Sequence, residues 1–191
     1  HLVGALIVTF AAIAIAEARR ADLLVSGQHI TEVGDAAGMT AKRTIDASGQ
    51  IVAPGFIDIH THSDMSLLLD GRGQSKVSQG VTTEVTGNCG FSPFPINPRH
   101  MQLHVDLLAG IGDDAMEISW TDLEGYRNVA QRQGIAVNVA PLVGHGALRI
   151  AAMGVEARPA RAQEMAQMQQ LLERQLDEGA FGLSTGLTYV P

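Results

Sequence analysis

The sequence predicts an α/β fold in which a small β-domain precedes a mostly parallel sheet. From about residue 21 to residue 51 the chain reads as short strands separated by turns. After Pro54-Gly55, strand-like runs alternate with helical stretches, which is typical of a parallel sheet. The first of these runs, at 55–61, is apolar on both faces, as expected for a strand covered on both sides.

The composition is that of an ordinary globular protein, because 46% of the 191 residues are hydrophobic and 17% are charged. The net charge of -7 provides no basic stripe to neutralise phosphates, so we expect neither a nucleic-acid nor a membrane partner. The chain begins at His1 without a methionine and stops directly after a strand-like segment. We therefore expect it to be a fragment of a longer protein.

Residues 2–16 are almost wholly apolar, but about 15 residues is shorter than the roughly 20 that a spanning helix needs. We favour two short buried strands, at 5–10 and 12–16, and with them a cytoplasmic location. The alternative is the apolar part of a signal peptide, although the basic residues that should precede it are absent.

Residues 1–52 are predicted to form the small β-domain, with strands at 22–25, 29–33 and 43–46. Residues 53–191 are predicted to contain four strands, at 55–61, 81–86, 135–143 and 180–184. Helices are expected at 65–79, 120–133 and 158–179, the second of them capped by Thr121. A long insertion at 97–119 reads as a loop over the active-site face.

Four such βα units make half of an eight-stranded (β/α)8 TIM barrel, truncated after its fourth strand. An open sheet of four or five strands is the alternative. In both architectures, active sites lie at the carboxyl ends of the strands.

Two histidines, His60 and His62, stand two residues apart at the end of the first of these strands. Side chains alternate along a strand, so both should point the same way, with backbones roughly 6 to 7 Å apart. One metal ion could take both. The alternative is a pair of ordinary hydrogen-bonded histidines.

The only cysteine, Cys89, follows the second predicted strand through a Gly-rich turn and should reach the same rim. A thiolate beside two imidazoles is a good zinc environment. Without the histidines, a buried and inert thiol would be the default interpretation.

Three more residues are candidates for substrate binding. His145 ends the third strand and could be a metal ligand, a substrate contact or a loop histidine. Arg149 could pair with a substrate carboxylate, although a solvated surface arginine is the commoner case. Tyr189 could donate a hydrogen bond to a carbonyl or carboxylate group, or be structural.

A family resemblance runs through these motifs. Residues 45–62, including Pro54-Gly55 and the His60-Thr61-His62 triplet, resemble the amidohydrolase superfamily. In that superfamily a β-sandwich segment is followed in the chain by a metal-binding barrel, which begins with its first strand. Gly87-Asn88-Cys89-Gly90 and the segments at 144–149 and 182–191 resemble the N-acyl-D-amino-acid deacylases, or D-aminoacylases. The resemblance covers about residues 22–191.

The resemblance implies zinc as the cofactor. His60 and His62 would be metal ligands from the first strand, and Cys89 would be the ligand between two metal positions. Most relatives use a carboxylated lysine on the fourth strand instead. Lys42 and Lys76 are the only lysines here and neither is near that strand, which disfavours dihydroorotases, hydantoinases and ureases.

The implied activity is zinc-dependent hydrolysis of the linear amide of N-acyl-D-amino acids, small molecules that yield a carboxylate and a D-amino acid. The family's aspartate proton shuttle would lie beyond Pro191, so we expect the fragment to be inactive alone. Alternatives are an amidohydrolase acting on a cyclic amide or as a deaminase, and a non-catalytic zinc-binding module. A structural zinc site needs four protein ligands, and only three good ones are present.

Overall fold

The computed structural model of the chain describes residues 3–4, 20–109 and 117–189. The strands expected at 5–10 and 12–16 lie outside the described residues. The chain divides into two compact units, His1–Phe56 and Ile57–Pro191.

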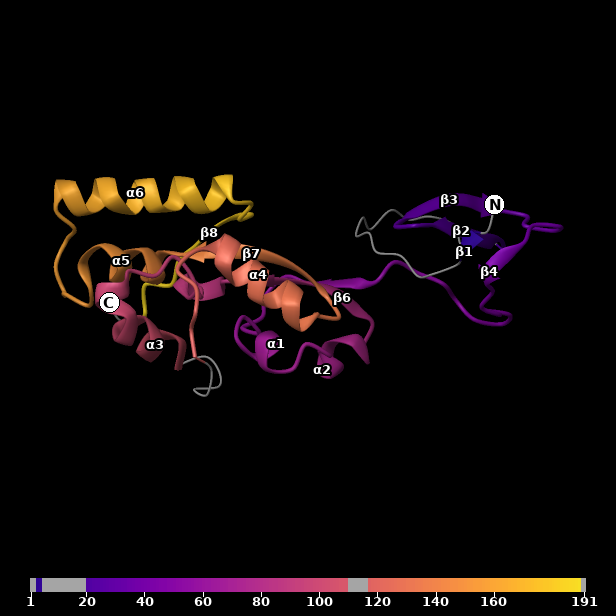
Figure 1. The fold of residues 1–191 in the computed structure, drawn as a ribbon, viewed down its shortest axis with the longest axis horizontal. Helices are drawn as coiled ribbons and strands as arrows, with labels where there is room; N and C mark the ends of the chain where they lie inside the picture. The colour runs from indigo at the N-terminus through magenta and orange to yellow at the C-terminus, as the bar shows by residue number, and fades with distance from the viewer. Residues whose placement is uncertain (1–2, 5–19, 110–116, 190–191) are drawn as a thin grey trace. The chain divides into compact units, whose positions relative to one another are not determined.

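The first unit is built from short strands (Figure 1). Strands β2 (Asp22–Ser26) and β3 (His29–Gly34) form an antiparallel hairpin. The parallel pair is β1 (Val3–Gly4) with β4 (Ala41–Arg43), so the strand expected at 43–46 lies earlier than predicted. Leu24 and Val25 of β2 are its buried apolar side chains among the described residues.

The second unit contains a four-stranded sheet whose strands follow the chain order, β5-β6-β7-β8. Their bounds are Phe56–Asp58, Val81–Thr86, Asn138–Gly144 and Gly182–Ser184. The pairs β6 with β7 and β7 with β8 are parallel. This α/β arrangement fits a partial TIM barrel.

Strand β5 differs from its prediction in length and in burial. It ends at Asp58, and Phe56 and Ile59 are 67% and 75% exposed, although a strand covered on both faces was expected. The strand lies at the edge of the sheet, where β6 is its only partner strand among the described residues.

The prediction of one continuous helix at 65–79 is wrong. The chain instead forms α1 (Ser66–Leu69) and α2 (Gln74–Val77). Gly73 between them has a φ of 52°, a left-handed conformation that interrupts a helix and that glycine adopts readily.

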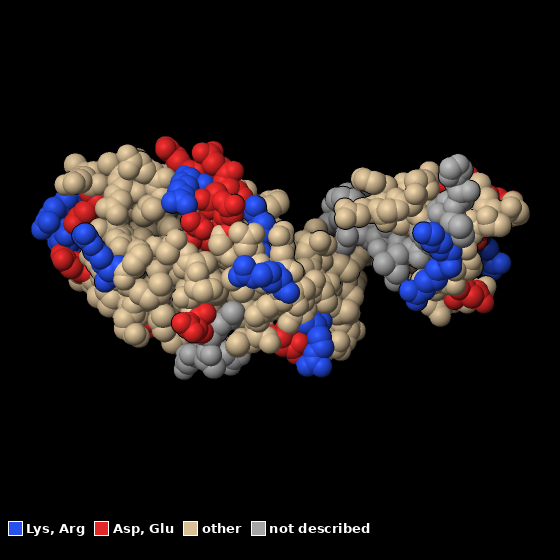
Figure 2. Space-filling model, viewed as in Figure 1, with Lys and Arg blue, Asp and Glu red and all other residues tan. Residues whose placement is uncertain are grey.

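The two other predicted helices are present with shifted starts. Helix α4 (Leu123–Gln133) is capped by Asp122 rather than Thr121, and the Asp122 carboxylate accepts the Gly125 N–H at 2.9 Å. Helix α6 spans Ala162–Asp177. Acidic and basic side chains gather over its C-terminal half (Figure 2), where Arg174 pairs with Asp122 at 2.6 Å and with Glu178 at 2.8 Å.

The insertion at 97–119 is not a loop throughout, because its described first part is helical. A 3-10 turn, η2 (Pro98–His100), leads into α3 (Met101–Ala109). Asn97 caps the start by accepting the Arg99 N–H at 3.1 Å. The buried side chains of His104 and Leu108 fix α3 against the rest of the unit.

The core of this unit lies between the sheet and its helices. Its buried side chains include Phe94, Trp120, Leu123, Tyr126, Val143 and Leu148. Helix α5 (His145–Met153) follows β7 directly and contributes Leu148. Within the described residues, no helix is both long enough and apolar enough to cross a membrane.

Candidate metal centre

His60 and His62 lie just beyond the end of β5 rather than on the strand, so strand alternation does not account for their placement. Their rings are nevertheless neighbours, with centroids 5.6 Å apart and planes at 74°. The residue between them explains this, because the Thr61 N–H donates to the Val85 carbonyl at 3.4 Å. The loop that carries both histidines, residues 59–65, therefore continues alongside β6. We call it the histidine loop.

Cys89 lies in η1 (Asn88–Gly90), a 3-10 turn that follows β6 through Gly87. Its Sγ atom is 3.3 Å from Nε2 of His60, and the donor atoms of His60, His62 and Cys89 all lie within 4.8 Å of one another. Two atoms bound to one tetrahedral zinc at 2.0–2.3 Å are about 3.5 Å apart. The donor set therefore fits zinc after a small adjustment.

The state of His62 also suits a metal. Burial lowers the pKa of His62, and the neighbouring His60 charge lowers it further. The neutral imidazole is the form that binds metals. Nδ1 of His62 is buried and has no hydrogen-bond partner among the described residues.

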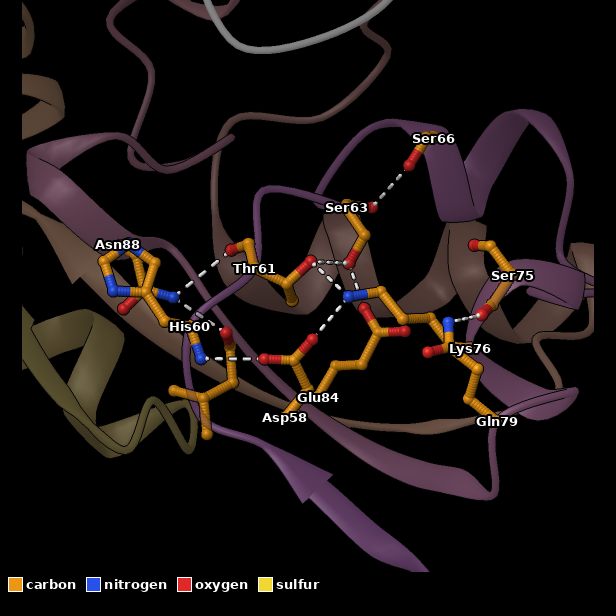
Figure 3. A network of polar contacts seen from close by, with 11 residues as sticks. Asp58, His60, Thr61, Ser63, Ser66, Ser75, Lys76, Gln79, Glu84 and Asn88 are labelled. Carbon is orange, nitrogen blue, oxygen red and sulfur yellow. Dashed lines mark hydrogen bonds and ion pairs between the residues drawn. The ribbon is translucent and has the colours of Figure 1, made fainter.

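A polar network supports the histidine loop from the side of α2 (Figure 3). Lys76 forms an ion pair with Asp58 and donates to Thr61 Oγ1 at 3.1 Å. Asp58 accepts the His60 N–H at 3.1 Å, and the Lys76 ammonium group lowers the pKa of Asp58. No sequence pattern indicates this role, because Lys76 and Asp58 are 18 residues apart.

Two buried carboxyl groups contact the histidine loop and the turn that carries Cys89. Glu84 is 0% exposed and accepts the Ser63 hydroxyl, and Asp64 is 1% exposed and accepts the Gly87 N–H at 2.7 Å. Burial raises the pKa of Asp64 to about 7. We did not identify either residue from the sequence, where they read as ordinary acidic residues near a strand.

A small pocket adjoins Cys89 and contains two of the three predicted substrate contacts. Its lining side chains are Cys89, Phe91, Leu107, His145, Leu187 and Tyr189. His145 is the first residue of α5, and burial lowers its pKa, with Arg149 lowering it further. Tyr189 packs edge-on against Phe91 with ring centroids 4.7 Å apart.

Arg149, the third predicted contact, does not line this pocket. Its guanidinium donates to the backbone carbonyls of Glu156 and Arg158, each at 3.2 Å. These contacts hold the connection between α5 and α6. One turn of helix separates Arg149 from the pocket-lining His145, and its substrate-binding role stays a prediction.

Comparison with known proteins shows the family to which the chain belongs. The sequence profile of the Amidohydrolase family matches residues 43–189. The chain belongs to the amidohydrolase family. As an amidohydrolase chain, it is 45% identical to an N-acyl-D-aspartate deacylase and 42% identical to a D-aminoacylase, both from Alcaligenes xylosoxydans xylosoxydans.

Each of these alignments covers 91% of this chain, but only 34% and 35% of the two relatives. The chain thus spans about a third of the length of the curated relatives it matches. A crystal structure of D-aminoacylase aligns with a TM-score of 0.77 and 40% identity, over 91% of this chain and 36% of that protein. An N-acyl-D-glutamate deacylase from Bordetella bronchiseptica, solved with zinc and a phosphonate inhibitor, aligns with a TM-score of 0.78 and 38% identity over the same shares.

Proposed function

We propose that the whole protein containing this amidohydrolase chain is a zinc-dependent N-acyl-D-amino-acid deacylase. It hydrolyses the linear amide of a small N-acyl-D-amino acid to a carboxylate and a D-amino acid. The observation that carries the proposal is the grouping of His60, His62 and Cys89 donor atoms within 4.8 Å. Three relatives that are 41–45% identical and named as deacylases of D-amino acids or as D-aminoacylase support the substrate class.

His60, His62 and Cys89 would hold the zinc, His62 as a neutral imidazole and Cys89 as a thiolate. Zinc, when bound, supplies Lewis-acid polarisation of the acyl carbonyl and a bound water of lowered pKa. The described part of the chain provides one part of the pocket wall. Phe91, Leu107 and Leu187 offer an apolar lining that excludes water from the substrate.

His145 and Tyr189 are the side chains we assign to substrate contact, because both line the pocket beside Cys89. Each could donate a hydrogen bond to a substrate carbonyl or carboxylate group. We assign proton transfer to the leaving amine to a carboxylate outside residues 1–191. Acid–base groups of this kind contribute typically 10²- to 10⁴-fold to rate.

The architecture we propose for the whole protein follows the same resemblance. Residues 53–191 would supply the first half of a (β/α)8 barrel, which the chain-ordered sheet β5-β6-β7-β8 supports. Residues 1–52 would belong to a small β-sandwich, which the β2–β3 hairpin and the β1–β4 pair support.

The test is amino-acid release by the full-length protein from N-acetyl-D-amino acids, N-acetyl-L-amino acids and cyclic amides. We expect release from the D-substrates, loss of release after zinc is removed by a chelator, and recovery when zinc is restored. The N-acetyl-D-aspartate and N-acetyl-D-leucine substrates together cover acidic and apolar side chains. Hydrolysis of only the L-forms or only the cyclic amides would overturn the proposal.

A further inference from the structure

Two buried polar side chains connect the loop that carries the histidines to the turn that carries the cysteine. Asp64, two residues after His62, accepts the Gly87 N–H at 2.7 Å. Asn88, directly before Cys89, donates from Nδ2 to the Thr61 carbonyl at 3.2 Å (Figure 3). The same amide also donates to the Val85 carbonyl at 2.8 Å, which fixes Asn88 against its own strand.

We propose that Asp64 and Asn88 are positioning residues that set the spacing between the histidine loop and Cys89 for a shared metal ion. This inference rests on the metal site of the proposed function. Neither residue belongs to the three-residue donor set. Each acts through its neighbours in sequence, on which the donor atoms are carried.

The two hydrogen bonds cross between the loops in opposite directions. The Asp64 side chain reaches from the histidine loop to the backbone of the cysteine turn, and the Asn88 side chain reaches back to the backbone of Thr61. Thr61 stands between the two histidines, so its carbonyl position sets theirs. Sliding one loop past the other would break both bonds. Metal ligands must be held within about 0.5 Å of the productive geometry, which makes such a restraint matter.

The Asp64 end of this connection rests on the core. The Tyr126 hydroxyl donates to the Asp64 backbone carbonyl at 2.6 Å. Tyr126 is 4% exposed and packs with its ring centroid 5.6 Å from those of both Phe94 and Trp120. The close-packed core therefore restrains the histidine loop at Asp64, the residue that contacts the turn carrying Cys89.

The cysteine end is pressed against the sheet. Gly87 has a φ of 75°, and a Cβ atom there would lie 2.1 Å from the Leu142 carbonyl oxygen of β7. Only glycine fits this approach, so the N–H that Asp64 binds has little freedom to move. Ser184 of β8 also holds this turn, donating to the Gly87 carbonyl and accepting the Gly90 N–H at 3.0 Å.

The experiment measures zinc affinity of the full-length protein by competition with a chromogenic chelator, for Asp64→Ala, Asn88→Ala and two finer variants. Asp64→Asn keeps an acceptor for the Gly87 N–H and should bind zinc within about threefold of wild type. Asn88→Asp removes the donor and should weaken zinc binding as Asn88→Ala does. Loss of a residue that orients metal ligands typically costs 10- to 100-fold in affinity, which is the loss expected for both alanine variants.

Asp122→Ala is the matched control, because Asp122 also accepts a glycine N–H but does so at the start of α4. It should lower the melting temperature and leave zinc affinity within about twofold. A second readout is cobalt substitution: the thiolate-to-cobalt charge-transfer band should weaken in Asp64→Ala and Asn88→Ala but not in Asp122→Ala. That band reports Cys89 coordination and not overall stability.

The outcomes separate this inference from the proposed function. If wild type binds no zinc, the metal site itself is wrong and the inference goes with it. If wild type binds zinc and both alanine variants keep its affinity, the positioning role alone is overturned. Equal losses in Asp122→Ala and Asp64→Ala would likewise overturn it, since general destabilisation would explain both. If Asp64→Ala does not fold, the Asn88→Ala and Asn88→Asp variants decide.

Discussion

The Sγ atom of Cys89 lies 3.3 Å from Nε2 of His60, although 29 residues separate them in the chain. The contact joins the loop after β5 to the turn after β6. Cys89 reaches it in a left-handed backbone conformation, with a φ of 57°, the only positive φ of a non-glycine residue in the described ranges. Such strain persists only where the surrounding structure enforces it, and it is expected at the metal ligand that we propose Cys89 to be.

Replacing Cys89 by glycine should relieve that strain at the expense of the metal. A left-handed residue other than glycine costs roughly 1–2 kcal/mol. We therefore expect Cys89→Gly to be about 1 kcal/mol more stable to urea than Cys89→Ala when both are metal-free, while both lose zinc affinity. Equal stability of the two variants would show that the backbone at Cys89 is not strained.

Gly87 should tolerate no side chain at all. Gly87→Ala combines a φ of 75° with a Cβ position 2.1 Å from the Leu142 carbonyl oxygen, so we expect a loss of about 3 kcal/mol or more. The matched control is Gly49→Ala, the third residue of a turn, with a similar φ of 74° and nothing within 4 Å of the new Cβ. It should cost only about 1 kcal/mol. Urea unfolding compares them, and similar losses would contradict the close approach at Gly87.

His104 should make part of the stability depend on pH. Burial lowers the pKa of His104 to about 4, below the ordinary value of 6.5, and its Nε2 contacts the Ser92 carbonyl at 2.9 Å. Between pH 6.5 and 4 the unfolded chain binds a proton that the folded chain does not. Above pH 6.5 the titration of His104 therefore does not reduce the free energy of unfolding. As the pH falls from 6.5 to 4, the free energy of unfolding decreases by roughly 3 kcal/mol.

The measurement is the difference in free energy of unfolding between wild type and His104→Gln at several pH values. Glutamine keeps a donor for the Ser92 carbonyl but does not titrate. Contributions from other groups, such as Asp64, are common to both proteins and cancel in the difference. The wild-type advantage should shrink between pH 6.5 and 4, and a difference independent of pH would refute the buried neutral imidazole.

Substitutions of Arg149 and Tyr189 should have different effects, the first on stability and the second on substrate binding. Arg149→Met removes the hydrogen bonds to the carbonyls of Glu156 and Arg158, so it should lower the melting temperature and leave KM within about twofold. Tyr189→Ala opens the pocket wall and should raise KM for the D-substrate about tenfold or more. A large KM change in Arg149→Met, with stability intact, would support the substrate-binding role we predicted from the sequence.

Much of the fold follows from local patterns in the chain. The strand at 81–86 is found at the predicted residues, and the chain-ordered sheet follows from alternating strands and helices. The break at Gly73 was missed because a helical pattern continues on both sides of it. The cap at Asp122 was not predicted because Thr121 is also of a residue type favoured at N-caps, and the backbone geometry selects Asp122.

The candidate site divides in the same way. His60, His62 and Cys89 could be selected from their residue types and from their places after strands. Asp64, Lys76 and Asn88 could not, because their roles depend on hydrogen bonds between segments 15 to 27 residues apart. Arg149 has a residue type suited to a carboxylate, but in the structure it contacts carbonyl groups of the connection between α5 and α6.

The most direct test of the metal site is X-ray absorption at the zinc edge of the full-length protein. We expect a first coordination shell with one sulfur at about 2.3 Å and nitrogen or oxygen neighbours at about 2.0 Å. The sulfur should disappear in Cys89→Ala. A wild-type shell without sulfur, or one whose sulfur survives that substitution, would contradict the assignment of His60, His62 and Cys89 as ligands of one ion.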